Sequence, residues 1–90
     1  NPQGRVSRQD MMVLLYRTLQ KSGYSLEEAE EGRLASFADS AQVAEYAQEA
    51  AAALIQNGII AGDKGRIKPQ SNASRAEVAV MLSRVLEKKQ

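Results

Sequence analysis

Apolar residues recur at helical spacing in three stretches of the chain. Intervals of three and four residues put such positions on one face of an amphipathic helix. The pattern predicts helices over about 8–21, 41–57 and 75–88. The apolar positions are Met11, Leu14, Leu15 and Leu19 in the first stretch, Val43, Tyr46, Ala47, Ala50, Leu54 and Ile55 in the second, and Val78, Met81, Leu82 and Val85 in the third.

Residues that start helices precede the first and third stretches. Ser74 is followed three positions later by Glu77, a capping box in which each residue satisfies a backbone N–H of the first turn. Ser7 and Asp10 form a weaker version, because the shorter Asp side chain reaches back less well. We expect Ser7, Ser74 and Glu77 to act as structural caps.

A third capping box lies between the first two stretches. Ser25 is followed by Glu28, and Gly32 is suited to end a helix. The pattern predicts a short acidic helix over 26–31. Its run of glutamates indicates a solvated linker face rather than a catalytic pair of carboxylates.

The second long stretch has boundary signals of its own. Asp39 precedes it and is expected to cap the helix, with support of a binding groove as the other role. Asn57 and Gly58 are expected to end the helix. The residues before Pro69 are expected to be extended, since a proline biases its predecessor away from helix. The fold class is therefore all-α, with at most a very short strand near the Gly-rich loop.

The chain contains an internal repeat at an offset of 67 residues. Residues 2–19 align with residues 69–86, and 8 of the 18 positions are identical. Such self-similarity indicates two copies of one structural unit, the first of which lacks its front half. The identical pairs are Pro2/Pro69, Gln3/Gln70, Ser7/Ser74, Arg8/Arg75, Val13/Val80, Leu15/Leu82, Arg17/Arg84 and Leu19/Leu86.

Composition narrows the range of functions. The chain has 12 basic and 11 acidic residues and a net charge of +1. This near-neutral balance lacks the excess of positive charge that nucleic-acid-binding proteins show. The chain has no Cys and no His, so thiol nucleophiles, the commonest general base and the commonest metal ligand are missing. No apolar run approaches the ~20 residues that span a bilayer. We therefore expect that the chain is not an enzyme and that it has no cofactor, metal site or transmembrane segment.

Six short motifs follow one another in the second half of the chain. They are Phe37-Ala38-Asp39, Tyr46-Ala47, Leu54, Gly58-Ile59-Ile60-Ala61-Gly62, Ile67-Lys68-Pro69 and Ser74-Arg75-Ala76-Glu77. In this order they resemble the repeat of the S-layer homology (SLH) family. Residues 1–21 resemble the second half of a preceding repeat. The resemblance implies helix–loop–helix repeats packed as a small helical bundle, with grooves between adjacent repeats.

This resemblance also implies a division of the chain and a function. Residues 1–24 would be the C-terminal half of one repeat, 25–33 a short acidic helical linker, and 34–90 a complete repeat. The implied function is non-covalent anchoring of an exported protein at the extracellular surface of a bacterial cell. The implied partners are a cell-wall polysaccharide or peptidoglycan-linked glycan, anionic and in some members pyruvylated, and an adjacent repeat.

Arg8 and Arg75 occupy the first position of two expected helices. A cation there opposes the positive end of the helix dipole at a cost of ~0.3–1 kcal/mol, so its occurrence in both copies indicates a use. Free N–H groups at a helix start, together with a guanidinium, suit a carboxylate, and the resemblance implies that this arginine lines the groove. The alternative is a pair of solvated residues.

Five further residues are candidates for glycan binding. Gly58 and Gly62 are expected to form turns with positive φ, to let the backbone approach a sugar, or both. Lys64 and Lys68, together with Arg66, form a small basic patch beside this loop. Such a patch is commonly a solvated loop, and beside the expected groove it is also suited to assist an anionic ligand. Tyr46 lies on the apolar stripe, so core packing is favoured over stacking on a sugar ring.

A second class of function stays open. Ninety residues bury only roughly 60–65% of the surface that the unfolded chain exposes, and an incomplete first repeat would leave apolar surface uncovered. The chain would then be a helical protein–protein or self-association scaffold without glycan binding, and a homodimer is expected. Glycan binding compared with particle size in solution separates the two classes.

Overall fold

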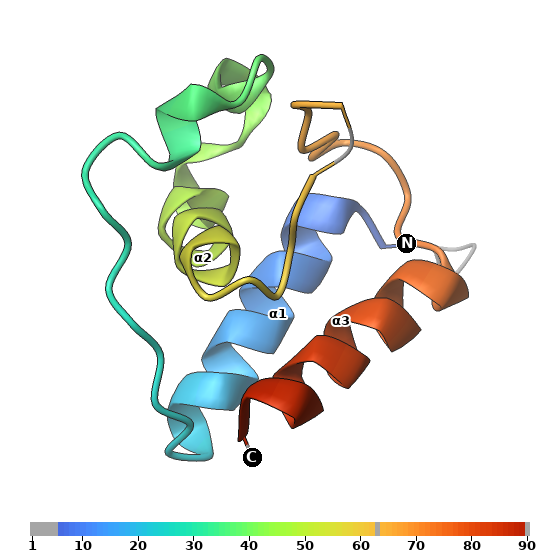
Figure 1. Cartoon of the computed structure of the whole chain (residues 1–90). Coiled ribbons are helices and arrows are strands. Elements are labelled where there is room, and N and C mark those ends of the chain that lie inside the picture. Colours follow the sequence, from blue (N-terminus) through green and yellow to red (C-terminus); the bar gives the residue numbers. More distant parts are fainter. Residues whose placement is uncertain (1–5, 63, 90) are drawn as a thin grey trace.

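The computed structural model describes residues 6–62 and 64–89, with side chains up to residue 87. Its elements are α1 (Arg8–Lys21), two 3₁₀ turns η1 (Leu34–Ser36) and η2 (Ser40–Gln42), α2 (Glu45–Gln56) and α3 (Arg75–Lys89). Figure 1 shows α1 and α3 running in the same general direction, with their N-terminal ends near the loop that follows α2. The all-α prediction is confirmed. Ser7 and Asn72 form an isolated antiparallel β-bridge.

The core forms where α1 packs against α2 and where the loop after α2 folds back over both. Alanines along α2 allow this close approach, since small side chains bring helix backbones together. The fully covered residues include Met12, Ala47, Leu54, Ile59 and Ile67. The third helix adds less, with Met81 and Val85 buried.

Two of the expected apolar stripes are shifted in part. Leu14 and Leu82 lie on the expected faces but are 54% and 48% exposed. Met12 and Val13 are buried in place of Leu14. The apolar periodicity predicted the helices correctly, but the buried face of each helix is displaced by part of a turn. Apolar residues also occupy positions next to the expected stripe, so the sequence pattern does not determine the exact buried face.

The predicted acidic helix over 26–31 is wrong, because residues 24–30 are not helical and residues 31–33 form a turn. The backbone N–H of Glu27 donates to Asn57 Oδ1 at 2.8 Å, and Asn57 Nδ2 donates to the Glu27 carbonyl at 2.9 Å. Leu26 packs against the core. These contacts with residues far along the chain override the local capping signal.

The helix expected over 41–57 begins later, at Glu45. Residues 40–42 form the 3₁₀ turn η2 instead, and the residue that caps α2 is Ala44. At the other end, Gly58 has φ 73° and the N–H of Ile59 donates to the Leu54 carbonyl. A glycine in the left-handed region commonly ends a helix in this way, and it turns the chain toward the groove described next.

Candidate functional site

A groove opens between the start of α1, the loop after α2 and one face of α3. Its volume is about 240 Å³. We call it the arginine groove, because a guanidinium stands on each side of an apolar floor. Its lining residues are Arg8, Ile59, Ile60, Ala61, Gly62, Ala76, Glu77, Val80, Met81 and Arg84.

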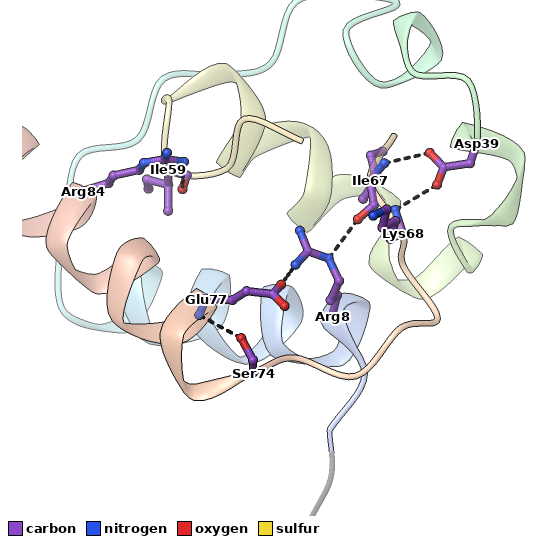
Figure 2. Close-up of polar contacts among 8 residues, drawn as sticks. All are labelled: Arg8, Asp39, Ile59, Ile67, Lys68, Ser74, Glu77 and Arg84. Atoms are coloured by element: carbon purple, nitrogen blue, oxygen red, sulfur yellow. Dashed lines mark hydrogen bonds and ion pairs between the residues drawn. The ribbon is translucent and has the colours of Figure 1, made fainter. Parts of the chain in front are cut away.

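Arg8 is held in this groove by partners from two other segments. Its Nε donates to the Ile67 carbonyl at 2.9 Å, and its guanidinium forms an ion pair with Glu77 of α3 (Figure 2). Only 19% of its side chain is exposed. The arginine that opposes the dipole of α1 thus reaches away from that helix and joins it to the loop and to α3.

Arg84 supplies the second guanidinium of the groove. It projects from α3, and its Nη1 donates to the Ile59 carbonyl at 3.3 Å. A guanidinium carries five N–H donors, and the contact with the Ile59 carbonyl uses one of them within the described residues. Arg84 is therefore suited to bind a carboxylate through two parallel hydrogen bonds. The motif comparison did not select Arg84, because it lies beyond the Ser-Arg-Ala-Glu element. The identity of Arg17 and Arg84 in the internal repeat was the signal that could have found it.

Gly62 forms part of the groove wall and has no room for a side chain. Its φ is 80°, and a Cβ on it would lie 2.5 Å from Cε2 of Phe37 and 3.1 Å from the Arg66 carbonyl. Gly58 also has a positive φ, but nothing lies within 4 Å of the corresponding position and it does not line the groove. Of the two glycines, only Gly62 combines a turn with close packing.

Asp39 holds the segment that Arg8 contacts and does not cap α2, which corrects the favoured expectation. Its two carboxylate oxygens accept hydrogen bonds from the N–H groups of Ile67 and Lys68, both at 2.8 Å (Figure 2). The side chain is 5% exposed. Burial by itself raises the pKa of Asp39, but the backbone hydrogen bonds and the charge of Arg66 outweigh it, and the pKa is lowered. The carboxylate is therefore charged and fixes the carbonyl of Ile67 where Arg8 contacts it.

The chemistry of the groove follows from these neighbours. Two guanidiniums and one carboxylate surround the hollow, and Val80, with a smaller part of Met81, provides accessible apolar surface. Such a site suits an anionic group that carries an apolar substituent.

A comparison with known protein families matches residues 36–79 to the S-layer homology domain. The chain carries an S-layer homology domain. The matched residues include α2, the loop after it and the first turn of α3. Searches of curated proteins and of solved structures matched nothing.

S-layer homology domains mediate anchoring to the cell wall and bind cell-wall polymers, and their role is one of binding rather than catalysis. The domain therefore associates this chain with a cell surface. Arg8 lies outside the matched residues but lines the groove with residues inside them. The groove thus joins the matched domain to the helix that precedes it.

The structure brings only some of the expected glycan-binding residues into the groove. Arg8 and Gly62 line it, whereas Arg75 lies in a separate, largely apolar hollow with Met11 and Val78. Lys68 lines a third hollow on the other side of Ile67. Lys64 is exposed, with a left-handed φ of 53°.

Tyr46 corrects the core-packing expectation. Its side chain is 59% exposed, and its hydroxyl donates to Asp10 Oδ1. That hydrogen bond, followed by some burial and the charge of Asp10, raises the pKa of Tyr46. Tyr46 lies outside the arginine groove, so it braces α1 against α2 rather than facing a groove-bound sugar.

The two expected serine caps are confirmed. Ser7 Oγ accepts from the Asp10 N–H at 3.2 Å, and Ser74 Oγ accepts from the Glu77 N–H at 3.1 Å. The carboxylate of Glu77 pairs with Arg8 across the groove, and its expected role as a cap stays a prediction.

In the part of the chain that the structure describes, no helix has the length and apolar character to cross a bilayer. Within those same residues, no group of three or more acidic side chains is arranged to hold a metal ion.

Proposed function

We propose that this S-layer homology domain anchors an exported protein on the outside of a bacterial cell by binding an anionic secondary cell-wall polysaccharide in the arginine groove. The observation that carries the proposal is the convergence of Arg8 and Arg84 on one hollow. Two guanidiniums from different helices, each tethered to a carbonyl of the loop after α2, form a preorganised anion site.

The groove favours a carboxylate on a sugar with an apolar substituent nearby. A pyruvate ketal has this combination, since its carboxylate can face the arginines while its methyl group contacts Val80, which is exposed in the groove. Glu77 supports selectivity, because it balances the charge of Arg8 and repels a ligand that presents its anion to the wrong side.

Co-sedimentation with purified bacterial sacculi tests this function. We expect the chain to pellet with intact sacculi and to remain in solution after the secondary polysaccharide has been stripped. Equal pelleting with stripped sacculi would show that the chain binds peptidoglycan rather than the secondary polysaccharide. No pelleting with either preparation would contradict glycan anchoring by this chain.

A second candidate is packing against a neighbouring S-layer homology repeat, favoured by the exposed apolar face of α3. In the internal repeat, the buried residues Val13 and Leu19 of α1 correspond to Val80 and Leu86 of α3, which are 46% and 63% exposed. The face that α1 uses to cover α2 is thus present on α3 and largely uncovered. An α2-like helix of another repeat, or of a second copy of the chain, fits this face.

A further inference from the structure

The start of α2 is capped by a side chain from another helix. Its N-cap residue is Ala44, which has no side-chain acceptor of its own. In a capping box, the third residue of a helix reaches back to the backbone N–H of the N-cap residue. In α2 that third residue is Ala47, which carries no acceptor. Gln9 of α1 supplies one instead, because its Oε1 accepts from the Ala44 N–H at 2.9 Å.

The packing of α2 explains why its cap comes from outside. Ala47, Ala51 and Leu54 are fully covered in the core between α1 and α2. A glutamine or glutamate at position 47 would place a polar group in this apolar interface, which is costly without a partner. The residue that local capping would use is therefore committed to the core, and α2 relies on α1 for the acceptor.

The third helix resembles α1 but lacks the two features that α2 uses. In the internal repeat, several apolar positions of α1 and α3 are identical, so both helices offer much the same apolar face. Gln9, however, aligns with Ala76, whose methyl group accepts no hydrogen bond. Met12, which is 1% exposed in the core, aligns with Ala79. With α3 in the place of α1, the Ala44 N–H would lose its acceptor and the space of the Met12 side chain would be empty.

We propose that Gln9 and Met12 are the residues by which α2 selects α1 over the related helix α3, and that they fix the order in which the repeats pack. Discrimination between two similar partners needs a demand that only one of them meets. The helix that precedes α2 in the chain meets it, and the helix that follows does not. This narrows the second candidate function, because an α2-like helix that covers α3 must begin with a cap of its own. The inference does not depend on glycan binding.

A double-mutant cycle on the full chain tests the role of Gln9. Gln9→Ala gives α1 the residue of α3, and Ala44→Pro removes the N–H that Gln9 accepts. Proline fits at this position, because Ala44 has φ −60° and Val43 before it is extended. We expect Gln9→Ala to lower the folding equilibrium constant about fivefold in the wild type, and to change it little in the Ala44→Pro background. Equal losses in both backgrounds, or no loss in the wild type, would overturn the selection by Gln9.

Amide hydrogen exchange at Ala44 follows the same contact directly. Gln9→Glu is the conservative variant, since its carboxylate keeps an acceptor for the Ala44 N–H. Exchange at Ala44 should be about fivefold or more faster in Gln9→Ala and remain slow in Gln9→Glu. An exchange rate that is the same in all three proteins would show that α2 does not use this acceptor.

A chimera of the full chain tests whether the two residues are sufficient for selection. Residues 8–19 take the sequence of residues 75–86, which changes positions 9, 10, 11, 12, 14, 16 and 18. One version restores Gln9 and Met12, and a matched control restores Leu14 and Thr18, both of which are exposed. Urea denaturation should give a folding equilibrium constant at least about tenfold larger for the first version than for the control. An equal or larger constant for the control, or failure of both versions to fold, would place the selection elsewhere in α1 and overturn the inference.

Discussion

At the scale of single residues, the carboxylate of Asp39 holds the segment around Ile67 that Arg8 contacts. It is buried and accepts two backbone N–H groups. In Asp39→Asn the amide can accept only on its oxygen, which leaves a buried N–H without an acceptor. We expect the free energy of unfolding to fall by about 2–4 kcal/mol, measured by urea denaturation at neutral pH.

The same carboxylate predicts a dependence of stability on pH. The pKa of Asp39 is lower in the folded state than its usual value of 3.8, so the folded state favours the charged form. Its contribution is complete above the unfolded pKa and is lost as the pH falls through the folded pKa. Denaturation from neutral pH down to about pH 2 should show a loss in wild type that Asp39→Asn lacks. Parallel pH curves for the two proteins would contradict this role.

Two glycines with similar φ should respond differently to the same substitution. Gly58→Ala introduces strain of about 1–2 kcal/mol from the left-handed φ alone. Gly62→Ala adds a clash with Phe37 and the Arg66 carbonyl, so a loss of about 3–5 kcal/mol is expected. Thermal unfolding of both variants checks the order, and equal losses would show that Phe37 moves aside without cost.

At the scale of elements, Asn57 holds the non-helical segment 24–30 against the end of α2 through Glu27. Its side chain is 1% exposed. It accepts a hydrogen bond from the Glu27 N–H and donates to the Glu27 carbonyl and, at 2.7 Å, to the Ala53 carbonyl. Asn57→Ala should cost about 2–4 kcal/mol of unfolding free energy and speed amide hydrogen exchange in the linker more than in α2. Exchange that rises equally in both segments would mean that Asn57 stabilises the fold without docking the linker.

The sequence predicted the helices well and their boundaries and connections less well. Local periodicity is sufficient for α1 and α3, because their apolar positions repeat over several turns. The 26–31 helix failed because Asn57 and Leu26 make contacts that no local pattern contains. The start of α2 was misplaced for the same reason, since Asp39 uses its carboxylate on Ile67 and Lys68 rather than on the next helix.

At the scale of the whole molecule, the exposed face of α3 predicts association. Leu82 and Leu86 are 48% and 63% exposed on this helix. We expect the 90-residue chain to self-associate with rising concentration, because burial of such side chains contributes about 1.5–3 kcal/mol each. Sedimentation velocity should show this, and Leu82→Gln/Leu86→Gln should remain monomeric. A wild-type chain that stays monomeric at high concentration would contradict the prediction.

The site was predictable from the sequence only in part. The family motifs led to Arg8 and Gly62, but they treated Arg75 as equivalent to Arg8. The structure separates the two, because Arg8 meets the loop after α2 and Arg75 meets no comparable loop within the described residues. Arg84 was not among the expected residues, since its place in the groove depends on the path of that loop past α3 rather than on a motif.

The most direct test of the account compares two arginines of α3 that differ in position. Arg84→Gln removes a guanidinium from the groove, whereas Arg75→Gln removes one from a separate hollow with the same change in charge. The measurement is the affinity of each variant for intact sacculi by co-sedimentation, after thermal unfolding has shown that both are folded. The account predicts a loss of about tenfold or more for Arg84→Gln and little change for Arg75→Gln. Wild-type affinity in Arg84→Gln, or an equal loss in both, would contradict glycan binding in the arginine groove.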